Sequence, residues 1–129
     1  MQNLAERIAQ DGSVNELDAV GWAIRLAKRL EALHALGVAH GSVSPACVET
    51  DGAERAKRGR LADVRSTPSN VAYQSPERVL GGDISIADDT WAVAATLYTL
   101  LTGSPPFAGG DEAELKQKIL AASPAPLAV

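Results

Sequence analysis

The stretch from Thr90 to Thr102 carries no charged residue, so a helix built from it has no charged face. A helix of this kind belongs at the centre of a core, where other elements surround it. Its apolar part, residues 91–101, ends at the breaker sequence 103–106 and is too short to cross a bilayer. The segment therefore predicts a central helix, starting after Asp88-Asp89, with the rest of one domain folded around it.

Two helices are predicted before the central one. The first is short and ends at the turn residues Asp11-Gly12. Ser13 and Glu16 have the spacing of a capping box, in which each side chain accepts a hydrogen bond from the other residue's backbone amide. The second helix then runs to about Leu36, with Gly37 just past its end as a left-handed cap.

The second helix has two apolar stripes, so most of its circumference is expected to be buried. One stripe consists of Leu17, Val20, Ile24 and Ala27, and the other of Trp22, Leu26, Leu30 and Leu33. His34 lies near the end of this helix, where a contact with the negative end of the helix dipole is the simplest interpretation.

Past Gly37 the sequence predicts a loop and then two short strands, 47–50 and 60–64, with Asp51-Gly52 opening the turn between them. Residues 65–75 are polar and are predicted to form an irregular surface segment. These elements add a small β-hairpin to a mainly helical chain.

A last helix is expected after Asp111, which caps it together with Glu114. Glu112–Lys116 and Glu114–Lys118 have the spacing of favourable ion pairs on one helix face. Residues 123–129 are predicted to be a disordered tail, which leaves 1–122 as the domain.

Composition narrows the functional classes. The chain has 129 residues, a net charge of −4 and five aromatic residues, a balance that argues against a nucleic-acid binder. Its one cysteine, Cys47, excludes a disulfide framework. The N-terminus lacks the pattern of a signal peptide, so we expect a cytoplasmic chain with no membrane segment. The alanine-rich composition suggests a bacterial source.

Four motifs carry a family resemblance. They are Leu36-Gly37-Val38-Ala39-His40 with Pro45, Arg60-Leu61-Ala62-Asp63, Tyr73-Gln74-Ser75-Pro76-Glu77-Arg78, and Asp89-Thr90-Trp91 with 97–107. In this order and spacing they resemble the large lobe of eukaryotic-type (bacterial Hanks-type) Ser/Thr protein kinases, over residues 4–120. The resemblance implies a mainly α fold class, a kinase-like C-lobe lacking the N-lobe and the last C-lobe helices.

The catalytic loop of this family holds an Asp that accepts the substrate hydroxyl's proton, a nearby Lys and an Asn for Mg²⁺. By the resemblance, these three positions correspond to Ser42, Ser44 and Cys47, and the Arg that precedes the Asp corresponds to Gly41. None of the four residues carries a charge that could steady a transferring phosphoryl group. We therefore expect no catalytic residue and no cofactor, which describes a degenerate pseudokinase rather than an enzyme.

Asp63 keeps the position of the family's metal-binding Asp, but Val64-Arg65 stand where Phe-Gly follows it. A single carboxylate holds Mg²⁺ weakly, so Asp63 is a weak metal candidate. A strand-end carboxylate that caps local amides is the favoured alternative. Neither Gly81-Gly82 nor Gly109-Gly110 follows a strand and opens a helix as a phosphate cradle does, so negligible nucleotide affinity is expected.

The resemblance implies structural roles for a further set of motif residues: His40, Pro45, Asp63, Pro76, Glu77 and Asp89. In the family, the Asp matching Asp89 binds the catalytic-loop backbone, and the Glu matching Glu77 pairs with an Arg beyond this chain. The face that would pack against the N-lobe is expected to expose apolar side chains. The interface candidates are His40, Leu61, Val64 and Glu77.

Several residues have both a functional and a structural interpretation. A packed histidine is favoured over a general base at His40, and a buried small hydrophobe over a nucleophile at Cys47. A solvated hairpin is favoured over an anion site for the basic cluster Arg55, Lys57, Arg58, Arg60 and Arg65. Phosphorylation of Ser66, Thr67 or Ser69 stays open.

The sequence thus predicts an inactive kinase-like C-lobe that acts as a protein–protein interaction, scaffold or regulatory module in signalling. Its partner would be another protein or a second copy, without nucleic acid. One alternative is a fragment of a Ser/Thr kinase, or a nucleotide-binding pseudokinase, whose N-lobe is supplied elsewhere. Another is a helical regulator that binds nucleic acid through the basic cluster.

Overall fold

A computed structural model describes residues 2–50, 61–64 and 70–121, with the backbone alone for Gln2, Thr50 and 61–64. The helices and strands, in chain order, are β1 (Gln2–Asn3), α1 (Leu4–Asp11), α2 (Glu16–Ala35), β2 (Val48–Thr50), β3 (Leu61–Val64), α3 (Pro76–Val79), α4 (Ile86–Thr102) and α5 (Glu112–Ala121). Single 3₁₀ turns occupy Pro45–Cys47 and Val71–Tyr73. The mainly helical fold class with a small β element is confirmed.

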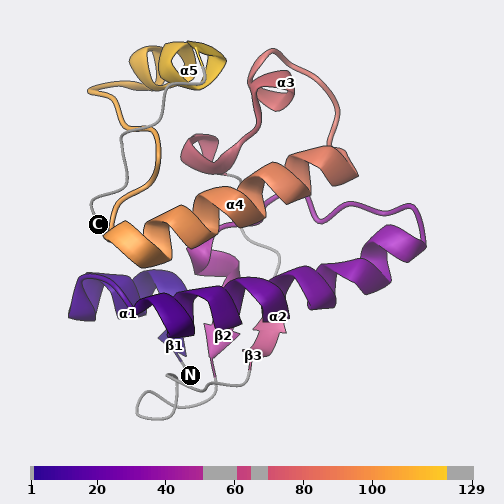
Figure 1. The fold of residues 1–129 in the computed structure, drawn as a ribbon. Coiled ribbons are helices and arrows are strands. Elements are labelled where there is room, and N and C mark those ends of the chain that lie inside the picture. The colour runs from indigo at the N-terminus through magenta and orange to yellow at the C-terminus, as the bar shows by residue number, and fades with distance from the viewer. Residues whose placement is uncertain (1, 51–60, 65–69, 122–129) are drawn as a thin grey trace.

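The helices α2 and α4 lie antiparallel, side by side, through the middle of the molecule (Figure 1). The α1 helix and the sheet lie on the α2 side, and α3 and α5 lie on the α4 side. The pair is fixed at both ends. The Val14 amide donates to the Leu100 carbonyl at 2.9 Å at one end. At the other end His34 Nε2 lies 2.8 Å from Asp89 Oδ2.

The sheet has three short antiparallel strands in the order β1-β2-β3. Glu49 is the central residue, opposite Asn3 on one side and Asp63 on the other. The antiparallel pair β2–β3 agrees with the predicted hairpin, whereas β1 was not expected, because a two-residue strand leaves no periodic pattern. The β2–β3 register has one irregularity, between Glu49 and Thr50.

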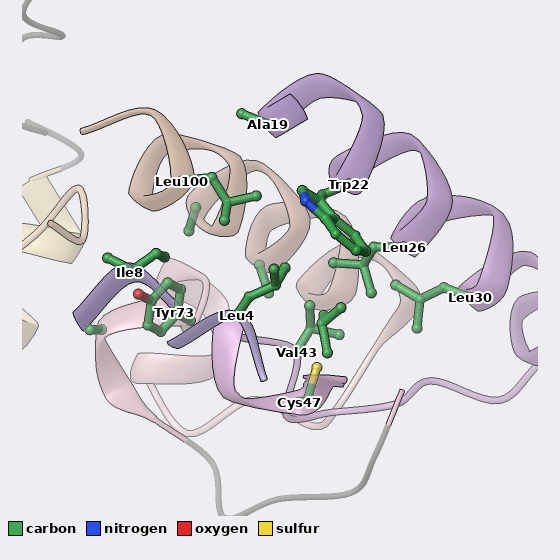
Figure 2. Packing of buried hydrophobic residues seen from close by; sticks show 14 residues of the cluster. Leu4, Ile8, Ala19, Trp22, Leu26, Leu30, Val43, Cys47, Tyr73 and Leu100 are labelled. Carbon is green, nitrogen blue, oxygen red and sulfur yellow. The ribbon is translucent and has the colours of Figure 1, made fainter. Parts of the chain in front are cut away.

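The core lies where α2, α4, β2 and the turn at Cys47 meet. Figure 2 shows Trp22, Leu26 and Leu30 of α2 directed toward Leu4, Val43 and Cys47, with Leu100 of α4 packed beside them. Each of these side chains is at most 3% exposed. The core therefore joins the first helix, the two central helices and the loop that precedes β2.

The central helix is longer than predicted. It begins at Ile86, four residues before Thr90, because Ser85 is its N-cap and its side chain accepts the Asp88 amide. Asp88 and Asp89 therefore lie inside the first turn instead of preceding the helix. Both are buried, with 4% and 1% exposure, and acidic side chains at this position are favoured by the helix dipole.

The predicted capping box at Ser13 and Glu16 is wrong. Asn15 caps α2 instead, and its side chain accepts the Asp18 amide at 2.9 Å. The predicted left-handed cap is confirmed, since Gly37 follows the helix with φ of 75°. A Cβ atom is strained at such a φ, which accounts for the glycine.

Only one of the two apolar stripes of α2 is buried, which corrects the prediction that both are. The stripe with Trp22, Leu26 and Leu30 faces the core. The opposite stripe faces outward, with Leu17 85% and Ile24 49% exposed. Composition alone could not separate them, because each stripe offers a comparable apolar surface and only tertiary packing selects one.

The last helix agrees with the prediction in its position and its pairs. Lys116 and Lys118 lie 3.6 and 3.5 Å from Glu112 and Glu114, and Asp111 accepts the Glu114 amide. Within residues 2–50, 61–64 and 70–121, none of the helices combines the length and apolar character that a bilayer crossing requires.

Some predictions concern residues outside the described ones. These are the Asp51-Gly52 turn, the basic cluster at Arg55, Lys57, Arg58, Arg60 and Arg65, the serines and threonine Ser66, Thr67 and Ser69, and the tail 123–129. They stay predictions.

The two stripes of α2 provide a matched test of the packing. Replacing Leu26 with alanine is expected to lower the free energy of unfolding by about 2–5 kcal/mol, because it opens a cavity beside Trp22. Leu17→Ala, on the same helix, is expected to change it by less than about 0.5 kcal/mol. Urea denaturation of both variants measures this, and equal losses would contradict the assignment of the two faces.

Candidate functional site

The loop after α2, residues 38–44, is held against the first turn of α4 by Asp89. One carboxylate oxygen, Oδ2, accepts the His40 amide at 2.8 Å, and Oδ1 accepts the Gly41 amide at 2.9 Å. This is the contact that the family resemblance implies for Asp89. Because the carboxylate is 1% exposed, these amides replace the water that would otherwise solvate it.

His34 adds a third donor to the same carboxylate. Its Nε2 lies 2.8 Å from Asp89 Oδ2, and its side chain is 21% exposed. An ionised carboxylate can only accept, so we assign Nε2 as the donor in this contact. The expected role of His34, a contact with the helix dipole alone, therefore missed its main partner, which lies 55 residues away in the sequence.

The adjacent carboxylate, Asp88, binds a different set of donors. Its Oδ1 accepts the Ser75 amide at 3.0 Å, and its Oδ2 accepts from Arg78 Nη1 at 3.0 Å. The same Arg78 nitrogen donates to the Gly41 carbonyl, also at 3.0 Å. The sequence placed Asp88 at a helix start and Arg78 in a family motif but gave no sign that the two side chains pair.

His40 and Ser42 lie together, but their geometry does not make an activated nucleophile. The Ser42 amide donates to His40 Nδ1 at 3.1 Å, which occupies the lone pair that a general base would use. The Ser42 hydroxyl is 3.3 Å from the same nitrogen. His40 is partly buried.

Cys47 is fully buried at the end of the 3₁₀ turn Pro45–Cys47, just before β2. Burial raises the pKa of its thiol to about 11, while the hydrogen bond from the Ser44 amide to Sγ at 3.4 Å lowers it only in part. A thiol with this pKa is protonated at neutral pH and is a poor nucleophile. Ser44 is also buried, and Pro45 begins the 3₁₀ turn that joins them.

The other predicted site residues lie at the edges of this arrangement. Pro76 opens α3, and Glu77, one of the interface candidates, is exposed. Leu61, Asp63 and Val64 lie in β3, where only the backbone is described, so their predicted roles stay predictions. Among the side chains that the structure describes, no three His, Cys, Asp or Glu gather as metal ligands.

Nine large apolar side chains of the described residues are exposed. They are Leu17, Val20, Ile24, Leu36, Val38, Leu80, Ile84, Ile86 and Leu120. Those on α2 form its outward stripe, and Ile84 and Ile86 lie at the start of α4. Sequence reasoning missed these surfaces because each sequence segment also fits a buried position.

Two central helices packed side by side, a short antiparallel sheet and a loop fixed by a helix-start Asp together form part of the protein kinase fold. The chain has this fold, and its homologues are Ser/Thr protein kinases. The fold and the family expected from the sequence motifs are thereby confirmed. No protein-family model matches the chain.

Two relatives and one structure illustrate the match. A calcium and calcium/calmodulin-dependent Ser/Thr kinase of rice (Oryza sativa) is 33% identical, over 91% of this chain and 25% of its own length. The probable kinase PknB of Corynebacterium glutamicum is 29% identical, over 84% and 19%. The crystal structure of Rad53 with AMP-PNP aligns with a TM-score of 0.76 at 26% identity, covering 95% of this chain and 33% of that one.

The fraction of each relative's length that aligns shows how much of a kinase this chain corresponds to. The chain spans about a quarter of the length of the first relative and less of the second. The similarity therefore shows the fold and that the homologues of this chain are Ser/Thr protein kinases, while activity, substrate and partner belong to proposals.

The buried thiol makes stability depend on pH at the alkaline end. Because the unfolded thiol has the lower pKa, 9.0 against about 11, its contribution to stability is complete below pH 9 and is lost as pH rises toward 11. A difference of two pKa units corresponds to at most about 3 kcal/mol. Urea denaturation from pH 8 to 10.5 should show this loss.

Cys47→Ser is the matched control for this titration, since its hydroxyl does not ionise in that range. The decline that remains in this variant reports other groups, including Tyr73, whose pKa burial also raises. An identical decline in both proteins would contradict the assignment to Cys47.

Proposed function

We propose that this chain is a catalytically inactive, kinase-derived lobe that acts through protein–protein contacts as a scaffold or regulatory module. The observation that carries the proposal is the loop at 40–47. Its backbone is bound by Asp89 as in an intact kinase loop, yet the positions that would do chemistry are Ser42, Ser44 and Cys47. The support is a preserved scaffold with uncharged residues at the reactive positions.

The chemistry of these residues supports inactivity. Phosphoryl transfer needs a base for the attacking hydroxyl and cations that balance the charge on the phosphate oxygens. The Ser42 hydroxyl is not a base near neutral pH, and Ser44 has no charge. Cys47 is buried and directs its sulfur to the Ser44 amide, so it does not serve as a metal ligand in place of Asn.

Gly41 makes the loop unsuited to the Arg that kinases carry there. Its φ is 87°, a conformation that strains any residue with a Cβ atom. A Cβ built on Gly41 would lie 2.8 Å from Ile84 Cδ1, the end of an exposed side chain that can move aside, so the positive φ is the constraint at this position. The backbone of the loop therefore favours glycine over arginine here, which supports a role other than catalysis.

The proposal includes a protein partner or a second copy, because the outward α2 stripe is an apolar surface on a folded lobe. It also includes a bacterial, cytoplasmic setting, which rests on the alanine-rich composition and the single buried cysteine. The alternative is a kinase fragment that receives an N-lobe from elsewhere. The chain spans only a small part of each relative's length, so the experiments below also test this alternative.

Nucleotide binding and phosphoryl transfer test the inactive assignment. With Mg·ATP, the protein is expected to show no shift in melting temperature and no transfer of labelled phosphate to itself or to a generic peptide substrate. Ser42→Asp with Cys47→Asn restores two reactive positions and is also expected to be inactive, because Gly41 and Ser44 are unchanged.

A full-length kinase relative serves as the positive control in both assays. Transfer by the wild-type chain would overturn the proposal. Transfer by the double variant alone would show that this chain completes an active site, and would favour the kinase-fragment alternative.

Light scattering coupled to size exclusion separates the two kinds of partner. A dimer that Ile24→Asp dissociates, while Glu31→Asp on the same helix leaves it intact, is expected if a second copy covers the α2 stripe. A monomer at every concentration would exclude self-association and leave a different protein as the partner.

A further inference from the structure

Two neighbouring carboxylates in the first turn of α4 bind the same loop in different ways. Asp89 accepts the amides of His40 and Gly41 directly. Asp88 reaches Gly41 through Arg78, whose Nη1 lies 3.0 Å from both Asp88 Oδ2 and the Gly41 carbonyl oxygen. Gly41 is thus held at its amide by one carboxylate and at its carbonyl by the guanidinium that the other carboxylate binds.

The second of these connections links three parts of the chain that are distant in sequence. Gly41 belongs to the loop after α2, Arg78 to α3, and Asp88 to α4. The other Asp88 oxygen accepts the Ser75 amide, so the residue that caps α3 is attached to the same carboxylate. A single ion pair therefore joins the loop, the start of α3 and the start of α4.

The surroundings make the loss of either partner of this ion pair costly. The Asp88 side chain is 5% exposed and that of Arg78 is 16% exposed. Hydrogen bonds between charged groups gain strength where water is scarce, and removing one partner leaves a buried charge without compensation. An ion pair in this position acts on the position of the loop as well as on local stability.

The α3 helix needs such an anchor. It has four residues, fewer than an isolated helix requires to be stable, and none of its residues is fully buried. Its cap, Ser75, is 2% exposed. The Ser75 amide and the Arg78 side chain both donate hydrogen bonds to the Asp88 carboxylate. Asp88 thus fixes both ends of α3 relative to the central helix.

We propose that Arg78 and Asp88 form an internal clasp that keeps the 40–42 loop and the 75–79 segment in one fixed arrangement without an added phosphate. The Asp88 carboxylate already supplies the anion that the Arg78 guanidinium binds. A phosphorylated side chain is therefore not needed to bind Arg78 and order the two segments. The surface made by these two segments is therefore ordered constitutively. This inference concerns the conformation of the chain and does not rest on the proposed function.

Hydrogen exchange in the intact protein tests the clasp. In Arg78→Met, the amides of residues 40–44 and 75–79 are expected to exchange at least about tenfold faster than in the wild type, since a charge-assisted hydrogen bond to each segment is lost. Amides in the buried part of α2, residues 22–30, are expected to keep their wild-type rates. Asp89→Asn provides the reference for direct loss of the loop contacts.

Arg78→Lys is the milder variant, because it keeps the positive charge and loses the planar guanidinium. It is expected to accelerate exchange at 40–44 less than Arg78→Met does. Lys28→Met and Asp83→Asn, both at exposed positions, are the matched controls and should leave both segments unchanged.

The results that would overturn the clasp are distinct. Wild-type exchange at 40–44 in both Arg78 variants would show that the Gly41 contact does not hold the loop. Loss of protection throughout the chain in Arg78→Lys would show a general effect on folding instead. Wild-type protein is also treated with phosphatase, and its mass is measured to show that it carries no phosphate. Both segments are expected to keep full protection from exchange in this sample. A loss of protection would show that the arrangement depends on phosphate.

Discussion

The carboxylate of Asp89 is the constraint on which the rest of this structure depends. A charge that is almost completely removed from water must be compensated by donors, and the chain supplies three of them. One comes from His34 at the end of α2, and two come from the loop at His40 and Gly41. The loop that follows α2 is therefore positioned in large part by the hydrogen bonds that this one buried carboxylate accepts.

The elements with a strong local pattern could be predicted from the sequence. The uncharged run at 90–102 indicated a central helix, and Gly37 marked the end of α2. The start of α4 was missed although Ser85 and Asp88 have the spacing of an N-cap. The acidic pair Asp88-Asp89 suggested that the helix begins only after these two residues. In a helix that starts within a core, an acid in the first turn can be fully buried, and composition does not show this.

The contacts that position the candidate site could not be predicted in the same way. His34 and Asp89 are 55 residues apart, and Arg78 meets Gly41 across 37 residues. A local pattern holds no information about pairs at such separations. The family resemblance supplied the Asp89 contact and the reactive positions. Arg78 lies in one of the quoted motifs and Asp88 in none of them, and neither the motifs nor the helical periodicity indicated that the two residues pair.

The fixing of α2 against α4 at both ends determines where the chain can change in length. One added residue inside α2 would rotate everything after it by about 100° and advance it by about 1.5 Å. The hydrogen bond from Val14 to Leu100 and the pair between His34 and Asp89 could then not both form. The span between these two contacts thus has a set number of residues, and variation in length is restricted to the segments that lie outside it.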